Sequence, residues 1–444
     1  MLDLTKVAKA MQGISQHLST EVAASRQRLE LAQDLMTAAY KNQAELMQRQ
    51  KQWRDRILFS TAVPMEPLNT CIDLPVPPKT HTVLATDGSQ IAPNHHEIAY
   101  CYLLNIGRVV LHYGQNRQPL LDSLPEVFYR PEDLYISRQW GIRTEEWMGY
   151  RRTASEATVL AELAAAVVGS RESGKRAGEA GGAEEVEEAE GATTNYQLPT
   201  TNYQSKIQNP KSKISQLPTP DSRLPTLAMV DGSLIYWFLE QLPLEARDRI
   251  LPPILTAWEQ LKALGIPIMG YLSASRSMES LNFLRLQACI HEVPDCASFC
   301  PNQIEKVPCQ VLEPLRDAAL WSIQLQPGQR STLWRSSARI LELYGDCAIY
   351  FCYIHVGTEI ARVEVPAWVA EDETLLNQSL GLMLAQVQKG YGYPVVLAEA
   401  HNQAVVRGGD RARFFAMLEQ QMIKAGLRNV GISYKEARKR GSIA

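Results

Sequence analysis

The chain has 444 residues and a formal net charge of −3, with 45% hydrophobic and 21% charged residues. This length allows one large domain with extensions or two to three domains, and the hydrophobic fraction allows a sizeable buried core. The near-neutral charge excludes a globally basic nucleic-acid-binding surface, so any contact with nucleic acid must come from local basic clusters.

The first residues lack the apolar stretch of a secretory signal. No segment has the ~18 consecutive apolar residues of a membrane helix. The eight cysteines are scattered through the chain, unlike those of a small disulfide scaffold. We therefore expect a reduced, cytoplasmic protein that is not bound to a membrane.

Residues 1–60 predict an N-terminal helical arm of one or two long helices. Its apolar residues recur at steps of three and four, which is typical of one helix face. Such a stripe indicates either a helix packed on its own domain or an arm used for dimerisation or partner docking. The stripe consists of Leu4, Val7, Met11, Ile14, Leu18 and Val22.

A proline-rich segment at 64–80 ends the helical region. The β-branched run HTVLATDGSQIAP follows at 81–93, and the apolar stretch 97–114 has a glycine near its middle. These two segments predict a strand followed by a hairpin. Residues 144–168 are rich in alanine and leucine and predict a helix.

Residues 170–224 differ in kind from the rest of the chain. They contain an acidic Gly/Ala/Glu run, and then TTNYQ occurs twice, at 193–197 and 200–204. Such repetitive, polar text cannot bury enough apolar surface to become ordered. We expect a disordered insertion and assign no function to it.

Beyond the insertion, helices and strands alternate. Residues 227–242 predict a buried strand that ends in Asp-Gly-Ser and leads into a helix. The further predicted elements are a helix and strand within 254–275, a hairpin at 345–366, a helix at 371–390, a strand at 394–400 and a helix at 409–426. This alternation implies an α/β sheet flanked by helices.

Two Asp-Gly-Ser tripeptides, at Asp87 and Asp231, each close an apolar β run. Turn formation alone explains one such tripeptide, because aspartate and glycine are common turn residues. The order of a strand ending in Asp, a hairpin, a helix with Glu and a strand ending in Asp is the RNase H-type arrangement. Phosphodiester hydrolysis by this arrangement uses carboxylates that hold two divalent ions ~4 Å apart. Asp87 is expected to bridge both ions because its strand is central.

The helical carboxylate is either Glu156 or Glu162. The two are six residues apart, so they point in different directions and only one can face the site. Tyr393 and His401 flank the predicted strand at 394–400. A lone histidine is commonly structural, but here His401 can ligate a metal or protonate a leaving group, since its ordinary pKa of ~6.5 suits either role.

Together these segments resemble the NurA nuclease family. The resemblance covers roughly residues 80 to 435 without the insertion, which departs from the family's compact link between helix and strand. The matching segments are VLATDGSQIAP with the hairpin after it, LAMVDGSLIYW, less closely YLSASRS, then GYPVVLAEAHNQAVV and GISYKEARKR.

The resemblance implies an RNase H-like mixed sheet flanked by helices in a nuclease domain at 80–440. It also implies site residues, all of them catalytic and all but the tyrosine metal ligands. The matching positions are Asp87, Glu156 with Glu162 as its substitute, Asp231, Tyr393 and His401.

The resemblance further implies a Mn²⁺-dependent 5′-to-3′ exonuclease and single-strand endonuclease, with Mg²⁺ as the alternative ion. The implied substrate is DNA, at ends and single-stranded segments, during resection in double-strand-break repair. The implied partners are a second copy of the chain and a hexameric HerA-type translocase. The alternative function is a non-catalytic DNA-binding or translocase-docking subunit whose aspartates are turn residues.

Two other groups of residues have either a structural or a functional interpretation. Cys289, Cys296, Cys300 and Cys309 with His291 are close in sequence, but their spacings lack the paired C-x2-C of common zinc modules. We therefore favour buried thiols over a structural metal.

A basic cluster near the end of the chain comprises Lys435, Arg438, Lys439 and Arg440. It is either a solvated tail or a phosphate contact. Arg276 is a further candidate for contact with the DNA backbone.

Overall fold

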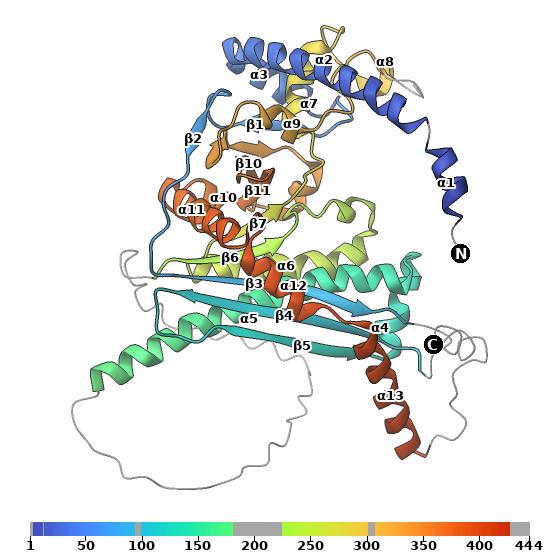
Figure 1. Ribbon diagram of the computed structural model, residues 1–444, viewed down its shortest axis with the longest axis vertical. Helices are drawn as coiled ribbons and strands as arrows, with labels where there is room; N and C mark the ends of the chain where they lie inside the picture. Colours follow the sequence, from blue (N-terminus) through green and yellow to red (C-terminus); the bar gives the residue numbers. More distant parts are fainter. Residues whose placement is uncertain (1–2, 12, 94–98, 181–223, 301–306, 427–444) are drawn as a thin grey trace. The chain divides into compact units, whose positions relative to one another are not determined.

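The computed structural model describes residues 3–11, 13–93, 99–180, 224–300 and 307–426 (Figure 1). The described residues form a mixed α/β structure with one large sheet, as the sequence predicts. The chain divides into two compact units, one made of 1–165 with 225–444 and the other of 166–224.

The helices are α1 (Leu4–Ala10), α2 (Ile14–Lys41), α3 (Gln43–Trp53), α4 (Pro131–Tyr135), α5 (Thr144–Ala180), α6 (Leu244–Ala263), α7 (Glu279–Arg285), α8 (Cys296–Phe299), α9 (Asp317–Ser322), α10 (Ala367–Ala370), α11 (Glu373–Lys389), α12 (Val395–Ala404) and α13 (Gly408–Lys424). The strands are β1 (Ala62–Pro64), β2 (Cys71–Asp73), β3 (His81–Ile91), β4 (Tyr102–Tyr113), β5 (Leu120–Phe128), β6 (Thr226–Asp231), β7 (Ile268–Leu272), β8 (Gln329–Ser331), β9 (Trp334–Ser336), β10 (Ile349–His355) and β11 (Ile360–Pro366).

The sheet has the strand order β1-β9-β10-β11-β7-β6-β3-β4-β5, with β8 joining β2 to β10. Strands β3, β6 and β7 run parallel, whereas β4 is antiparallel to β3 and β5 is antiparallel to β4. The five strands from β5 to β7 are therefore consistent with the RNase H-type arrangement expected from the sequence. The predicted hairpin at 345–366 is also present, as β10 and β11.

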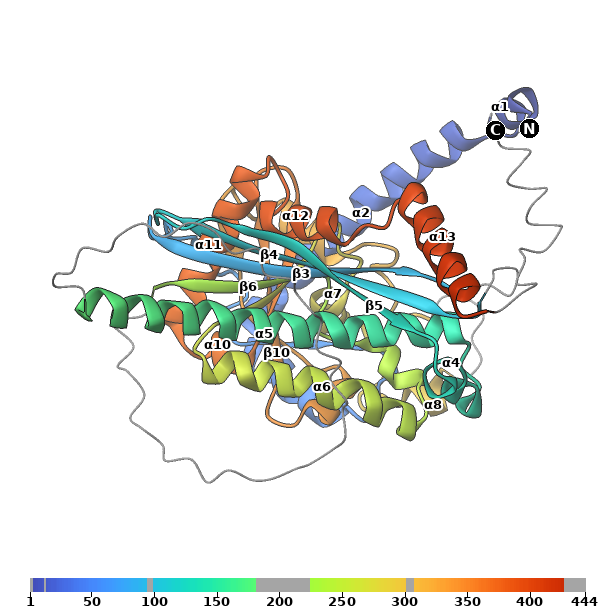
Figure 2. The same cartoon turned by 90° about the horizontal axis from the view of Figure 1, so that it is seen from below.

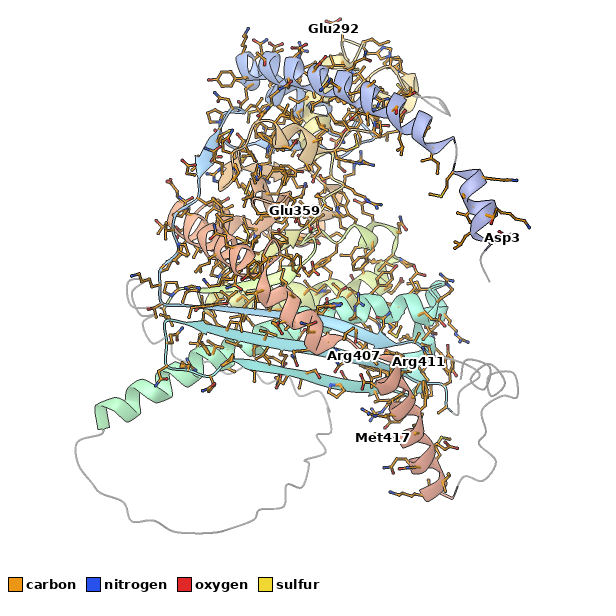
Figure 3. The ribbon with its side chains drawn as sticks, in the orientation of Figure 1. Asp3, Glu292, Glu359, Arg407, Arg411 and Met417 are labelled. Atoms are coloured by element: carbon orange, nitrogen blue, oxygen red, sulfur yellow. The ribbon has the colours of Figure 1, made fainter. Side chains whose placement is uncertain are left out.

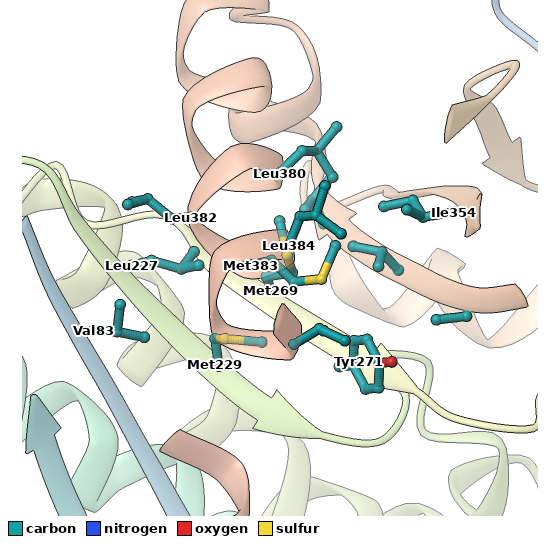
Figure 4. Close-up of a cluster of buried hydrophobic side chains, with 14 of the residues drawn as sticks. Val83, Leu227, Met229, Met269, Tyr271, Ile354, Leu380, Leu382, Met383 and Leu384 are labelled. Atoms are coloured by element: carbon teal, nitrogen blue, oxygen red, sulfur yellow. The ribbon is translucent and has the colours of Figure 1, made fainter. Parts of the chain in front are cut away.

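Helices lie on both faces of the sheet. Figure 2 shows α5 and α6 on one face and α11 and α12 on the other. The main core packs sheet residues such as Val83, Met229 and Met269 against Leu380 and Met383 of α11 (Figure 4). Burial of these apolar side chains is the main term that stabilises the layers.

The N-terminal region forms three helices. Its second half packs on the domain, whereas its first half does not. Ala32 and Met36 of α2 are buried in a cluster with residues of α7 and α9. The prediction that the apolar stripe from Leu4 to Val22 packs on its own domain is wrong, because Val7 is half-buried and the other members are exposed. The exposed members are Leu4, Met11, Ile14, Leu18 and Val22.

Two further expectations need correction. The predicted strand at 394–400 is part of helix α12, in which Val396, Leu397, Ala400 and Ala404 are buried at helical spacing. The first residues of the expected insertion are helical, because α5 continues to Ala180 despite glycines at 169, 174 and 178 that disfavour helix.

Residues 181–223, which hold most of the expected insertion and both TTNYQ repeats, lie outside the described residues. So does the basic cluster at 435–440. Among the helices that the structure does describe, none is long and apolar enough to span a membrane.

A buried ion network joins the second Asp-Gly-Ser to the sheet. Arg362 of β11 is 2.6 Å from Glu279 and 2.7 Å from Glu364. Glu364 in turn accepts hydrogen bonds from Ser233 Oγ at 2.8 Å and from the Leu234 amide at 2.7 Å. The turn after Asp231 is thereby fixed by buried, paired charges.

Candidate active site

Asp87 and Asp231 occupy equivalent positions on neighbouring parallel strands. The β3–β6 ladder runs to the pair Thr86 and Val230, and the two aspartates are the next residues along. Strand β3 does not end at Asp87 as expected, because it continues to Ile91 in its pairing with β4. Strand β6, in contrast, ends at Asp231. Asp87 therefore lies within β3, at the level where the neighbouring strand β6 ends.

Helix α12 lies unusually close to the sheet beside Asp87. Gly107 of β4 is the cross-strand partner of Asp87. A Cβ atom at position 107 would overlap the carbonyl oxygen of Ala400 and lie 2.5 Å from the nitrogen of Ala404. Only glycine allows this approach of helix to strand.

Polar side chains of the sheet fix the end of α12. Asn105 Nδ2 donates to the carbonyl oxygen of Ala404 at 2.7 Å, and Ser89 Oγ donates to the same oxygen at 2.5 Å. One turn earlier, His401 Nδ1 is 2.8 Å from Asp87 Oδ2. The side chain of His401 is 64% exposed and that of Asp87 is 21% exposed, so the pair faces solvent through the imidazole.

Glu156 reaches the same region from α5, on the opposite face of the sheet. Its Oε1 lies where a Cβ atom at Gly88 would stand, so glycine at the first Asp-Gly-Ser makes room for it. Arg152, one turn earlier on α5, has its Nε 3.2 Å from that oxygen. Thr86 Oγ1 donates to the Glu156 carbonyl at 2.9 Å, which fastens α5 to β3.

Asp87 affects the pKa of both other carboxyl groups, and Asp231 affects that of Glu156. Burial raises the pKa of Glu156 to about 8; Arg152 opposes this shift, and Asp87 and Asp231 add to it. Burial also raises the pKa of Asp231, with a further increase from Asp87. Such mutual repulsion marks a cluster of like charges, a common feature of functional sites.

The two candidate glutamates differ in their surroundings. Glu162 is exposed, and its charge acts on Arg108 of β4, whose pKa it helps to raise. Glu156 has Asp87 and Asp231 as its electrostatic neighbours. The structure therefore brings Glu156, and not Glu162, to the aspartates.

Tyr393 completes the group from the turn between α11 and α12. Its hydroxyl is hydrogen-bonded to Asp231, which opposes the rise in the pKa of that carboxyl. Burial and the charge of Asp231 raise the pKa of Tyr393 in turn. Its ring packs edge-on against Tyr271, with the centroids 5.7 Å apart. Tyr393 is thus a neutral donor held against one of the aspartates.

The donor set fits a hard divalent cation in kind, because carboxylate oxygens and imidazole nitrogen are accepted ligands of Mg²⁺ and Mn²⁺. A cation here would also offset the repulsion among Asp87, Glu156 and Asp231. As the side chains stand, no three His, Cys, Asp or Glu groups of the described residues form a metal-binding arrangement. Arg152 and His401 are the groups that now pair with Glu156 and Asp87.

Several residues at the site are absent from the sequence-based prediction: Ser89, Asn105, Gly107 and Arg152. The glycine in the middle of an apolar β run is the one signal that could indicate a close backbone contact. Beyond α12, the exposed Arg407 and Arg411 lie at the beginning of α13 (Figure 3). Arg276 is exposed in the segment after β7, and no contact in the structure ties it to the site.

Comparison with known proteins gives one family. A model described as "NurA domain" matches residues 81–406, from the first residue of β3 to just beyond α12. The crystal structure of the NurA nuclease from Sulfolobus solfataricus is 13% identical, with a TM-score of 0.42, over 87% of this chain and 95% of that chain. A crystal structure of NurA with manganese is 11% identical, with a TM-score of 0.31, over 81% of this chain and 91% of that chain.

No curated protein matches the chain significantly. The family model spans well over half of the sequence and includes both Asp-Gly-Ser turns, the part of α5 that carries Glu156, and α12. The chain belongs to the NurA domain family.

Proposed function

We propose that this protein is a metal-dependent nuclease that hydrolyses DNA phosphodiester bonds, with its active site at the junction of β3, β6, α5 and α12. One observation carries the proposal: five side chains from distant parts of the sequence meet at the point where β6 ends. They are Asp87, Glu156, Asp231, Tyr393 and His401.

Asp87, Glu156 and Asp231 are the residues that would hold divalent ions, with His401 as a further candidate ligand. The ions supply an activated water and stabilise negative charge on the phosphate. Tyr393 keeps Asp231 oriented through its hydrogen bond. Arg152 holds Glu156 beside Gly88 when no metal ion is bound. To bind an ion, the Glu156 carboxylate would rotate toward it.

His401 is suited to move a proton. When Nδ1 carries a hydrogen, it donates to Asp87 Oδ2, 2.8 Å away, and the carboxylate fixes the orientation of the ring. Nε2 is then the nitrogen left to hold or release a proton toward a leaving oxygen. The same geometry leaves Nε2 as a possible ligand position, so the two roles must be separated by experiment.

The finer proposal is resection of DNA ends with 5′-to-3′ polarity and cleavage of single strands. Mn²⁺ is the proposed ion, with Mg²⁺ as its alternative. Family membership supports this proposal. The exposed Arg407 and Arg411 beyond α12 support a DNA contact, because a protein of net charge −3 needs local basic clusters to bind phosphates.

The alternative proposal is a non-catalytic DNA-binding or translocase-docking subunit. The observation in its favour is that Asp87 and Glu156 pair with His401 and Arg152 instead of standing in a ready ion site. The enzyme is favoured because turn-forming aspartates alone would not require a half-buried glutamate beside them.

A cleavage assay separates the two functions. Duplex and single-stranded DNA, labelled at either the 5′ or the 3′ end, are incubated with the protein in Mn²⁺, in Mg²⁺ or in EDTA. We expect cleavage with Mn²⁺, none with EDTA, and none by Asp87→Asn or Asp231→Asn. DNA binding without cleavage in either metal would support the non-catalytic subunit.

We further propose that the protein works as a homodimer with a hexameric HerA-type translocase. The exposed apolar stripe of α1 and α2 is compatible with an arm that another chain covers. Light scattering of the purified chain should give twice the mass of one chain. Co-purification with a co-expressed HerA-type ATPase tests the second partner, and a monomer that fails to bind it contradicts both proposals.

A further inference from the structure

Four of the eight cysteines gather around one small pocket, away from the candidate active site. Cys289, Cys296, Cys300 and Cys309 all line it. The expectation of buried thiols is wrong for these four, because each is half-buried. By contrast, Cys101, Cys347 and Cys352 are buried and Cys71 is exposed. Inert packing therefore does not explain why four accessible thiols share one pocket.

The turn at α8 brings the backbones of Cys296 and Cys300 close together. Cys296 begins the single turn of α8, and the amide of Cys300 donates to the Cys296 carbonyl at 3.1 Å. Residues four apart on a helical turn project from the same face. Cys289 and Cys309 reach the pocket from the segments before and after this turn.

A cationic side chain contacts one of the four sulfur atoms, and thiolates are the form of cysteine that binds metals. Arg285 Nε and Nη2 each donate to Cys309 Sγ at 3.2 Å. The side chain of Arg285 is only 9% exposed, so its positive charge acts on the sulfur with little screening by water.

The thiols also lie near one another. Cys300 has Cys296, Cys309 and Cys289 as electrostatic neighbours. As thiolates the four would repel one another, so a shared cation would stabilise them.

We propose that Cys289, Cys296, Cys300 and Cys309 form a four-thiolate metal centre that holds either one Zn²⁺ or an iron–sulfur cluster. Both are bound by four cysteines in proteins. His291 is not part of this set, because its ring stacks on Phe299 with the centroids 4.4 Å apart.

In the described part of the chain, no three such side chains already stand at positions that could hold a metal. Binding therefore requires the thiols to turn inward. A cysteine side chain does this by rotation about a single bond between staggered positions. All four are half-buried and therefore not locked in a packed core.

The centre would fasten the segment around α8 to the N-terminal helices. The same pocket is lined by Trp53 of α3 and by Ile57 and Phe59 beyond it. Arg285 stacks over Phe59 at 4.0 Å from the ring centroid, and the Cys296 amide donates to the Arg56 carbonyl at 2.9 Å. Bound metal would thus add a link among parts of the chain that also share one apolar cluster.

Metal content and absorption spectrum test the proposal. The full chain is purified without oxygen and without metal-affinity resin, and bound zinc, iron and acid-labile sulfide are measured. About one zinc per chain indicates the single-ion form, and iron with matching sulfide plus absorption near 400 nm indicates the cluster. Protein purified without metal is reconstituted with Zn²⁺ alone, or with iron and sulfide under reducing conditions.

Cys296→Ser and Cys300→Ser should each lower the bound metal at least twofold, and Cys71→Ser is the matched control that should keep it. Far-ultraviolet circular dichroism checks that each variant is folded. If a variant does not fold, loss of the same metal from wild type on titration with a thiol-specific mercurial replaces it. Wild type that binds neither metal after reconstitution, or equal metal in all variants, overturns the proposal.

This outcome is independent of nuclease activity. The manganese or magnesium of the cleavage reaction binds oxygen and imidazole ligands, and EDTA-washed protein is assayed for zinc and iron alone. Asp87→Asn should therefore lose cleavage and keep the thiolate metal, so failure of one proposal does not resemble failure of the other.

Discussion

Asp87 interacts with side chains on both faces of the sheet. Its Oδ1 accepts the Gly88 amide at 2.8 Å, and its Oδ2 lies 2.8 Å from His401 Nδ1. Its charge raises the pKa of Glu156, which comes from the other face. A single carboxylate therefore contacts α12 directly and α5 through its field, so substitution at this position should disturb both.

Glu156→Gln should abolish cleavage and change how stability depends on pH. The pKa of Glu156 rises from 4.5 to about 8 on folding. Between these values the unfolded chain is ionised and the folded chain keeps its proton, so the wild-type free energy of unfolding falls as pH rises. Glutamine has no such loss, so the variant should be more stable by about 1 kcal/mol or more above pH 8.

Urea unfolding in EDTA from pH 4 to pH 9 measures this difference, which should vanish near the acid end. Glu162→Gln is the matched control on the same helix, because Glu162 is exposed. It should keep both cleavage and the wild-type pH profile. A control variant that loses cleavage while Glu156→Gln retains it would show that the helical carboxylate is misassigned.

His401→Ala should lower the cleavage rate and leave DNA affinity nearly unchanged. Groups that act only in the transition state alter the chemical step without altering binding. A general acid contributes roughly 10²–10⁴-fold. If His401 is instead a metal ligand, high Mn²⁺ should restore part of the rate, whereas a missing proton donor is not restored.

Single-turnover rates across a Mn²⁺ titration distinguish these roles. Asn402→Ala, an exposed neighbour on the same helix, serves as the control and should cleave like wild type. Normal cleavage by His401→Ala, combined with a lower melting temperature, would make the histidine a structural residue.

At the scale of elements, α12 shows why the local sequence at 394–400 predicts a strand although it is helical. Its first residues, Val395 to Leu397, are a short β-branched apolar run of the kind that also begins buried strands. The later residues AEAHNQA favour helix, and Pro394 suits a position just before a first helical turn. The helix places His401 one turn before its fixed end, which a strand of the same residues would not do.

Gly107→Ala should displace α12 and reduce both stability and activity. The new methyl group would lie 2.5 Å from the Ala404 nitrogen, so the helix must move outward. Overpacking of this kind costs about 1–3 kcal/mol. Because His401 moves with the helix, the cleavage rate should fall about 10-fold or more.

The melting temperature and the cleavage rate test this effect. Gly149→Ala on α5 is the control, since no atom lies within 4 Å of a Cβ there. Alanine in a helix is favoured over glycine by about 0.5–1 kcal/mol, so the control should be slightly stabilised and fully active. Equal stability of the two variants would contradict the close packing of α12.

At the scale of the whole molecule, the sequence predicts the strands that carry Asp87 and Asp231, because β-branched runs closed by Asp-Gly-Ser are a local pattern. The sheet order from β5 to β7 agrees with the expected arrangement. Choosing Glu156 over Glu162 depended on the packing of α5 against Gly88. Asn105 contacts a residue almost 300 positions away, at Ala404, and no local pattern encodes such a contact.

Arg362→Met should strongly destabilise the entire fold. The arginine is 2% exposed and is paired with Glu279 and Glu364, which its loss would leave buried without a countercharge. Breaking a buried ion pair costs about 3–5 kcal/mol. Denaturant unfolding should show this loss, with partial recovery when both glutamates are also changed to glutamine.

The exposed pair of Arg413 and Asp410, 3.8 Å apart, gives the comparison. Arg413→Ala should change the free energy of unfolding by less than about 1 kcal/mol. A similarly small effect of Arg362→Met would mean that the buried network does not stabilise the sheet.

The distance along the chain between Asp87 and His401 also governs when the candidate active site can first assemble. These paired residues are 314 positions apart, and the helix that carries His401 is followed by one further described helix, α13. A ribosome adds roughly 5–20 residues each second, so the first aspartate waits many seconds for its partner. A chain that stops between Asp231 and His401 therefore has both aspartates without the histidine, and under the proposed function such a chain would not cleave DNA.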